Sequence, residues 1–162
     1  MKLKLRLTIE LVPSTSWFNN VRALVSKKQW DYLKSQVASK AYNLCEICGG
    51  VGPKHPVECH EIWSFDNKKL VRKLEGMIAL CPDCHMVKHI GLAEVRGLKV
   101  RALRHLMSVN KMTSKKAEVY VEEAFKVWAE RSKKTWTLDI SHLEGYGIDV
   151  KQLTRGPTQS RS

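Results

Sequence analysis

The stretch from Cys81 to His89 (C-P-D-C-H-M-V-K-H) places two thiols and two imidazoles at two different spacings. Cys81 and Cys84 form a C-x-x-C pair, which is the spacing at which two thiolates bind one ion. His85 and His89 are four residues apart, so on a helix they project from one face and can bind a second ion. The stretch therefore predicts two neighbouring ion sites of different chemistry.

A second C-x-x-C pair, Cys45 and Cys48, lies upstream of the first. The four thiols of Cys45, Cys48, Cys81 and Cys84 supply the tetrahedral sulfur set of a structural zinc site. The glycine-rich turn after Cys48 suits a tight loop whose backbone amides point at the sulfurs. Cys59 is left over and is expected to be a small buried apolar residue. Two C-x-x-C pairs in a chain with an odd number of cysteines, five, favour metal binding in a reducing compartment over a disulfide framework.

The chain is strongly basic, with 28 Lys and Arg against 16 Asp and Glu and a formal charge of +12. Such an excess is not typical of metabolic enzymes acting on small neutral substrates, and it favours a polyanionic partner. The residues predicted to contact phosphates are Lys88, Arg96, Lys99, Arg101 and Arg104. For any single one of them, a solvated helix face is an equally good interpretation.

No targeting or membrane segment is expected. The N-terminus alternates Lys and Leu instead of showing a charged head followed by an apolar run, and no stretch reaches membrane-spanning length. We therefore expect a soluble protein of the reducing cytoplasm, neither exported nor bound to a membrane.

With 43% apolar residues, the 162-residue chain is long enough for one domain over residues 1–150. The tail 151–162, rich in Thr, Ser, Gly and Arg, is expected to be disordered. Residues 2–12 alternate apolar and charged side chains, which predicts a half-buried strand. Ser26 and Gln29 have the spacing of a capping box and predict a helix over 27–41.

The centre of the chain predicts a β-hairpin followed by helices. Two β-prone segments, 57–65 and 70–80, flank a turn at Asp66. Pro82 suits the first turn of a helix that carries both histidines and ends near Gly91.

The remaining elements follow from periodicity. Helical spacing of apolar residues predicts helices over 92–107 and from a cap at Thr113 or Ser114 through Trp128. Residues 135–140 alternate again and are expected to pair with the N-terminal strand. The chain is therefore predicted to be of the α+β class.

The segment Glu58-Cys59-His60-Glu61-Ile62 lies between the two C-x-x-C pairs, and the second pair is followed by His85 and His89. In this order the sequence resembles HNH endonucleases of the ββα-metal class that carry an additional four-cysteine zinc site. The resemblance covers residues 42–91, which would form the core of the domain. Outside it, residues 1–41 are expected to form an N-terminal strand and helix, and residues 92–150 a helical extension. It implies a hairpin followed by a helix, with a catalytic divalent ion held between them and a separate zinc pinning the ends of the motif.

The resemblance implies that His60, His85 and His89 hold the catalytic ion, which would be Mg²⁺, Mn²⁺ or Zn²⁺. The implied activity is hydrolysis of phosphodiester bonds in DNA, giving 5′-phosphate and 3′-hydroxyl ends, in a small phage, plasmid or defence-system protein, and the implied partner is double-stranded DNA. His105 and His142 stand alone, and a lone histidine is more often a surface or hydrogen-bonded side chain than a ligand.

Two positions depart from the family pattern. The catalytic general base, a histidine in the family, falls on Glu61 next to His60, and the family's middle asparagine falls on Gly76. These departures are chemically linked, because a carboxylate base has no ring for the asparagine to orient.

Alternatives for Glu61 stay open at this point. In a regular strand His60 and Glu61 point to opposite faces, so both reach one site only if the strand is bulged or ends there. Otherwise Glu61 is an ordinary outward-facing carboxylate with no part in the site, and His55 or Glu58, which lie close to it in sequence, could serve as the general base instead. A further alternative is that Glu61 is itself a ligand, which would make the histidine site a closed structural zinc site. The alternative to a nuclease is an inactive HNH-like zinc module that binds nucleic acid or a protein partner as an inhibitor or regulator. The sequence also leaves open whether the chain forms a homodimer.

Overall fold

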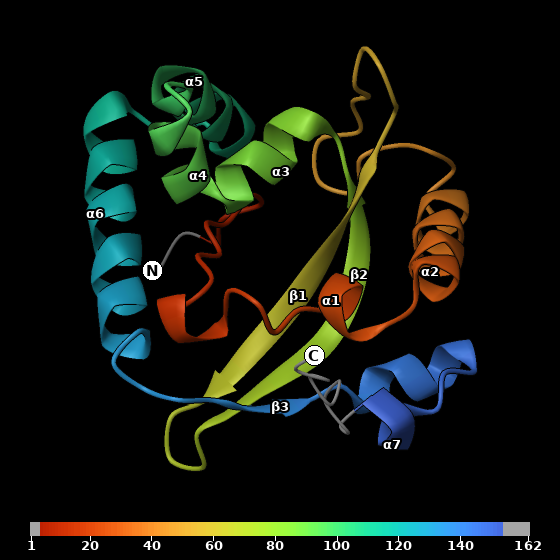
Figure 1. Cartoon of the computed structure of the whole chain (residues 1–162). Helices are drawn as coiled ribbons and strands as arrows, with labels where there is room; N and C mark the ends of the chain where they lie inside the picture. The colour runs from red at the N-terminus through yellow and green to blue at the C-terminus, as the bar shows by residue number, and fades with distance from the viewer. Residues whose placement is uncertain (1–3, 154–162) are drawn as a thin grey trace.

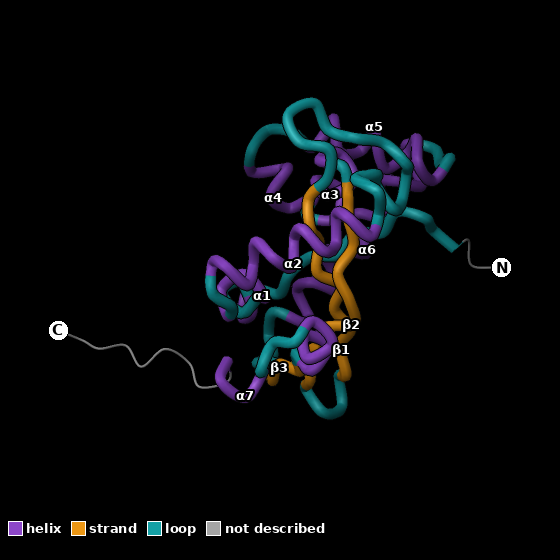
Figure 2. Tube along the Cα trace, turned by 90° about the vertical axis from the view of Figure 1, so that its right-hand side faces the viewer, coloured by secondary structure: helices purple, strands orange, loops and turns teal. Residues whose placement is uncertain are grey.

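The computed structural model describes residues 4–153, which form a three-stranded sheet with helices packed on both faces (Figure 1). Strands β1 (Glu58–Asp66) and β2 (Val71–Leu80) are antiparallel, and β3 (Thr137–Asp139) pairs parallel with β2, which gives the order β1-β2-β3. Figure 2 shows the two long strands running between α3 at one end and β3 at the other. The predicted α+β class is confirmed.

The predicted hairpin is present, and its turn has a clear local cause. The Asp66 side chain accepts hydrogen bonds from the backbone N–H groups of Lys68 and Lys69, at 2.9 and 3.0 Å, as an aspartate at the start of a tight turn does. The pairing is regular from Glu58 to Ile62 and then shifts at a bulge between Ile62 and Trp63. Side chains therefore alternate strictly between the two faces over the part of β1 nearest the cysteines.

Four helices cover one face: α3 (Pro82–Lys88), α4 (Ile90–Val95), α5 (Lys99–Asn110) and α6 (Ser114–Arg131). Their apolar sides bury Leu80 of β2 together with Leu7 and Ile9 of the N-terminal segment. The single helix predicted over 92–107 is divided in two, because the chain reverses at Gly97, whose φ of +73° glycine adopts without strain.

The other face is covered by α2 (Lys27–Lys40), α1 (Val21–Leu24), α7 (Val150–Leu153) and the 3-10 helix η2 (Ser141–Tyr146), while a short 3-10 helix, η1 (Ser14–Ser16), precedes α1. The predicted capping box is present: Ser26 Oγ accepts from Gln29 N at 3.1 Å, and Gln29 Oε1 accepts from Ser26 N at 2.9 Å. None of the helices in the described part is long and apolar enough to span a bilayer.

The prediction of an N-terminal strand is wrong for residues 4–12, the part of it that the structure describes. Its backbone bonds to side chains instead of a neighbouring strand. Asn110 Oδ1 accepts from the N–H of Arg6 and of Leu7, Asn110 Nδ2 donates to the Leu7 carbonyl, and the Tyr120 hydroxyl accepts from Ile9 N. These bonds satisfy polar groups that a sheet would otherwise pair.

Two further predictions need correction or restriction. The alternating segment near residue 137 does form a strand, but it pairs with β2 and not with the N-terminal segment. Of the tail predicted to be disordered, residues 151–153 belong to α7, and residues 154–162 lie outside the described part.

Candidate metal centres

The four paired cysteines come together in space. Cys45 and Cys48 lie in the loop after α2, and Cys81 and Cys84 lie at the start of α3. Their sulfur atoms all lie within 4.8 Å of one another, and the Sγ atoms of Cys48 and Cys81 are 3.6 Å apart. This cluster can hold a metal ion.

The backbone around the cluster is shaped for sulfur, as the glycine-rich turn predicted. The amide of Gly50 donates to Cys48 Sγ, and the amide of Cys84 donates to Cys81 Sγ, both at 3.4 Å. A side chain at Gly52 would place its Cβ 2.5 Å from the His55 carbonyl and 2.7 Å from Pro82 Cδ. Only glycine therefore lets the loop approach the first turn of α3 this closely.

The thiols perturb one another. Hydrogen bonding from the Cys84 thiol lowers the pKa of Cys45 to about 4, whereas burial first and then neighbouring groups raise the pKa of Cys81 to about 11. The pKa of Cys84 is raised through its bond to Cys45 and by burial. Four crowded thiols cannot all ionise unless a cation joins them, and a coordinated metal supplies that charge.

Cys59 lies apart from the cluster, on the sheet face covered by α2, where it packs against the core. Burial raises its pKa to about 12, which keeps the thiol neutral. The expectation of a small buried apolar residue is met in part, because Cys59 packs against the core but is only half-buried.

His105 was expected to be a surface or hydrogen-bonded side chain, and its Nε2 lies at hydrogen-bonding distance, 3.1 Å, from Cys84 Sγ. It reaches the cluster from α5, so the sulfur site is also tied to the helical extension. No local sequence signal marks this contact, because the two residues are brought together only by the packing of α5 on α3.

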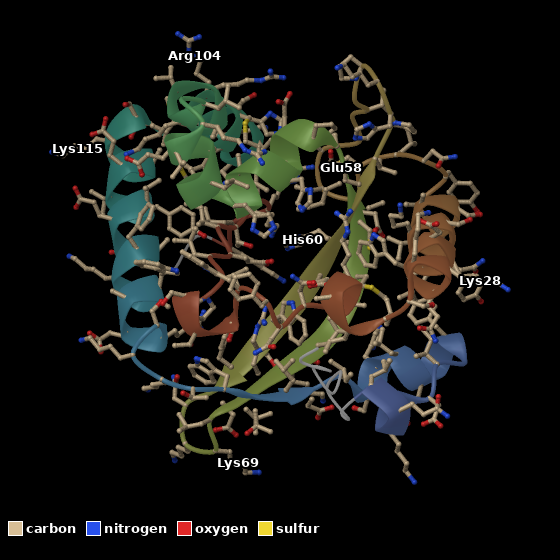
Figure 3. All side chains as sticks on the ribbon, viewed as in Figure 1. Lys28, Glu58, His60, Lys69, Arg104 and Lys115 are labelled. Atoms are coloured by element: carbon tan, nitrogen blue, oxygen red, sulfur yellow. The ribbon has the colours of Figure 1, made fainter. Side chains whose placement is uncertain are left out.

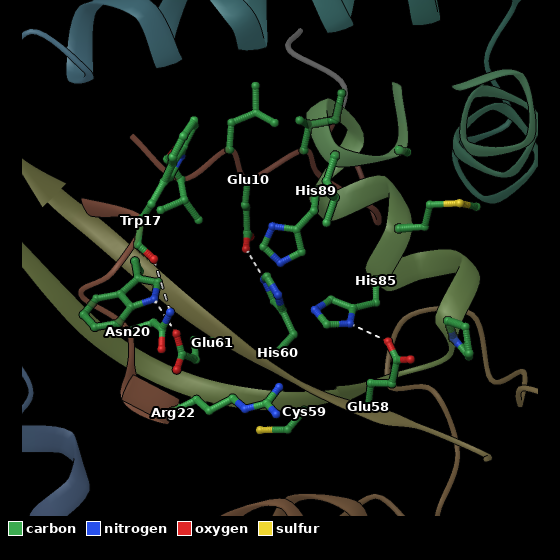
Figure 4. A pocket seen from close by; sticks show the side chains of 18 of the residues that line it. Glu10, Trp17, Asn20, Arg22, Glu58, Cys59, His60, Glu61, His85 and His89 are labelled. Atoms are coloured by element: carbon green, nitrogen blue, oxygen red, sulfur yellow. Dashed lines mark hydrogen bonds and ion pairs between the residues drawn. The ribbon is translucent and has the colours of Figure 1, made fainter. Parts of the chain in front are cut away.

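The three predicted histidines also converge, apart from the sulfurs (Figure 4). His60 comes from β1, His85 from α3, and His89 directly follows the last residue of α3. One ligand atom from each lies within 4.8 Å of the others. The three ring centroids are 5.0, 5.3 and 5.3 Å apart, and each pair of rings is inclined by 66 to 71°. Three imidazoles arranged so evenly can share one ion.

Two of these rings are held by carboxylates. Glu58 Oε2 lies 2.5 Å from His85 Nδ1, and Glu10 Oε2 lies 2.5 Å from His60 Nε2. An ionised carboxylate can only accept, so each ring donates one N–H and, when neutral, keeps a lone pair on its other nitrogen. Histidines that bind metals are commonly oriented by a carboxylate in this way.

The electrostatics suit metal binding. Burial alone would raise the pKa of Glu10, but the hydrogen bond from His60 and the Lys88 ammonium outweigh it and lower that pKa to about 2. Burial lowers the pKa of His60, and burial together with the neighbouring imidazoles lowers the pKa of His89 to about 3. Both rings are therefore neutral at pH 7, the form that coordinates an ion.

The sequence interpretation missed Glu10. Its only local signal is that it is the sole acid among the first twelve residues. Its partner Lys88 was predicted to contact phosphate, and that prediction is wrong, because Lys88 is only 3% exposed. Lys88 Nζ instead donates to Glu10 Oε1 at 3.0 Å and to Thr8 Oγ1 at 2.8 Å.

The other basic candidates lie at the surface of α4 and α5 or next to it. Arg101 pairs with Asp83 at 2.8 Å, and Lys99 pairs with Glu94 at 2.9 Å. Arg104 projects outward from the middle of α5 (Figure 3). Of the five predicted phosphate contacts, Arg96 and Arg101 line the cleft described below.

Glu61 is not brought to the three histidines. It belongs to the regular part of β1, so it faces away from His60. Its carboxylate accepts from Val21 N at 2.7 Å and from Trp63 Nε1 at 3.3 Å, and burial raises its pKa. Gly76, the other departure, pairs with Ile62 across the hairpin.

A cleft of about 930 Å³ runs along the β1 side of the sheet. The three histidines, Glu10 and Glu58 line one part of it, and Trp17, Arg22, Glu61 and Trp63 line another (Figure 4). The histidine cluster thus opens on a space large enough for a ligand.

The chain matches no protein-family model, no curated protein and no solved structure.

Proposed function

We propose that this chain is a metal-dependent endonuclease of the HNH type that hydrolyses phosphodiester bonds in DNA and leaves 5′-phosphate and 3′-hydroxyl ends. The observation that carries the proposal is the convergence of His60, His85 and His89, from a hairpin and the helix after it, on an open cleft. On this proposal β1, β2 and α3 form a ββα-metal unit. The net charge of +12 supports a polyanionic substrate.

Two ions of different roles are proposed. Four cysteines with hydrogen-bonded sulfurs suit a structural zinc, whereas three imidazoles beside a cleft suit a divalent ion with positions left for a substrate. When bound at the histidines, such an ion polarises the scissile phosphate and stabilises the departing 3′ oxygen. Glu58 and Glu10 fix the orientation of two of the rings, and Lys88 offsets the charge of Glu10.

A second candidate is an HNH-like module that binds nucleic acid or a protein without turnover. The placement of Glu61 favours it, because the residue at the position of the general base faces away from the three histidines. Glu61 as the base therefore stays a prediction that only activity can test.

Plasmid cleavage separates the two candidates. Zinc-loaded protein is incubated with supercoiled plasmid and Mg²⁺ or Mn²⁺, and nicked and linear products are followed over time. The nuclease proposal expects cleavage that His89→Ala abolishes and His142→Ala leaves intact, because His142 contacts Tyr146 away from both clusters. No cleavage by the wild-type protein, together with tight binding to DNA, would favour the module.

Binding as a function of salt tests whether DNA is the partner at all. Neutralising several phosphates releases counterions, so the logarithm of the association constant should fall steeply with the logarithm of salt concentration. A flat dependence would remove DNA as the partner of either candidate.

A further inference from the structure

Between η1 and α1 the chain exposes two large aromatic side chains. Trp17 is 57% exposed and Phe18 is 87% exposed. Trp17 lines the cleft that contains the three histidines, whereas Phe18 does not. Arg22, on α1, lines the same cleft.

A half-buried carboxylate, Glu61, and a buried guanidinium, Arg72, hold the segment between η1 and α1 in place. Glu61 accepts from Val21 N at 2.7 Å, and Arg72 donates from Nη1 to the Asn19 carbonyl at 2.7 Å. Arg72 is 1% exposed, and its Nε has no partner within the described residues. Burying a carboxylate and a guanidinium opposes folding unless their bonds compensate. Both of these groups direct hydrogen bonds to the backbone of the same short segment.

The indole of Trp17 is fixed although much of its surface is open. Its Nε1 donates to the Val12 carbonyl at 3.0 Å, and its own carbonyl accepts from Asn20 Nδ2 at 3.4 Å. Asn20 also caps α1 by accepting from Ala23 N at 2.8 Å. A rigid, exposed aromatic ring at a cleft is suited to stacking on another flat ring.

The Arg22 side chain lines the cleft, and its guanidinium ends beside Cys59 (Figure 4). Its guanidinium makes no hydrogen bond or ion pair with any residue from 4 to 153, whereas Arg101 on the same cleft is paired with Asp83. An arginine that has no partner in the described part of the chain, on the cleft that contains the three histidines, is available to an anionic group.

We infer that Trp17 and Arg22 form a subsite for one unpaired nucleotide, with the base stacked on the indole and a phosphate bound by the guanidinium. The inference rests on the proposed nuclease function and specifies its substrate: a strand with an unpaired base beside the bond that is cut. Base stacking on an aromatic side chain supplies affinity without sequence preference, since every base has a flat face. Glu61 is then a positioning residue, which acts through α1.

The test compares the binding of a labelled single-stranded DNA oligonucleotide with that of the blunt-ended duplex of the same strand and its complement, by fluorescence anisotropy. Zinc-loaded full-length protein is used without Mg²⁺ or Mn²⁺. Trp17→Ala should weaken binding of the single strand about tenfold or more and change duplex binding by less than about twofold. Trp17→Phe, which keeps a ring but loses the N–H bond to Val12, should restore most of the single-strand affinity.

Two matched substitutions complete the test. Phe18→Ala removes a more exposed aromatic that does not line the cleft and should leave both affinities unchanged. Arg22→Ala should lower the salt slope for the single strand by about one, and Lys115→Ala, on the outside of α6 (Figure 3), should lower it by less.

The outcomes separate this inference from the proposed function. Wild-type protein that binds neither DNA form would overturn both. Binding of both forms that Trp17→Ala leaves unchanged, or weakens equally for the two, would overturn the nucleotide subsite alone. Loss of single-strand binding by Trp17→Phe as large as by Trp17→Ala would do the same, because it would assign the effect to the Val12 bond.

Discussion

Glu10 and His60, fifty residues apart in the chain, are joined by a hydrogen bond of 2.5 Å between Oε2 and Nε2. Through this bond the N-terminal segment becomes part of the histidine cluster. Glu10 also binds Lys88, which ends α3, so one carboxylate connects the segment, the hairpin and the helix.

Substituting Glu10→Gln should weaken divalent-ion binding at the histidines by about 10- to 100-fold, because the carboxylate that orients His60 is lost. Titration calorimetry of the zinc-loaded protein with Mn²⁺ measures this. Glu130→Gln, which removes an exposed carboxylate paired with Lys133, is the control and should bind normally. Equal affinities for the two variants would show that Glu10 does not support the site.

Glu61 variants should separate a base from a positioning residue. If Glu61 acts through α1, Glu61→Ala should raise KM for the DNA substrate several-fold and leave kcat and Mn²⁺ affinity nearly unchanged, because the bond to Val21 N is lost. Glu61→Gln keeps an oxygen acceptor and should have a smaller effect. If Glu61→Gln instead slows turnover by about two to four orders of magnitude at unchanged KM, the loss expected for a missing proton acceptor, Glu61 is the general base.

The sulfur cluster should contribute directly to folding. Cys84→Ser should release one equivalent of zinc and unfold the region that joins the hairpin to α3, since structural zinc binding is folding free energy. Thermal melting followed by circular dichroism, with zinc content measured in parallel, tests this. Cys59→Ser, the cysteine outside the cluster, should keep its zinc. A normal melting curve for Cys84→Ser would contradict the structural role.

Gly52→Ala should destabilise the fold by about 1 to 3 kcal/mol, because its new Cβ would overlap Pro82 and the His55 carbonyl. Gly145→Ala is the matched control, since nothing lies within 4 Å of a Cβ at that position. Midpoints of urea unfolding measure both. Equal midpoints for the two variants would mean that the loop moves aside at no cost.

Asn110→Ala should lower the free energy of unfolding by about 2 to 3 kcal/mol, because the buried N–H of Leu7 loses its acceptor and the Leu7 carbonyl loses its donor. Asn67→Ala, at the exposed hairpin turn, should change it by less than about 0.5 kcal/mol. If both variants unfold at the same urea concentration, the backbone of the N-terminal segment must find other partners.

Features with a local cause were predicted well from sequence. The capping box at Ser26 and the turn at Asp66 are made by residues within three positions of each other, so a short window contains the whole interaction. The two C-x-x-C pairs and the pair His85 and His89 are likewise recognised from local spacing. Only the pairing of the two cysteine pairs with each other, and of His60 with the two histidines, depends on distant residues.

Features that depend on distant partners were not predicted. The alternation in residues 4–12 is real, with Leu7 and Ile9 buried, yet the segment pairs with the side chains of Asn110 and Tyr120 and not with a strand. Glu10 and His105 reach the two clusters from elements that no short window connects. For the same reason, the partner of β3 could not be read from its own residues.

Cys84 and His85 are consecutive residues, so a single peptide bond connects the two clusters. On the proposed function, a newly synthesised chain without zinc at the four cysteines lacks the sulfur anchor at the first turn of α3, so the backbone that carries His85 is held less firmly and only the bond to Glu58 orients its ring. This would set the order of maturation: zinc must bind the four cysteines before the protein can cleave the DNA of the cell that makes it.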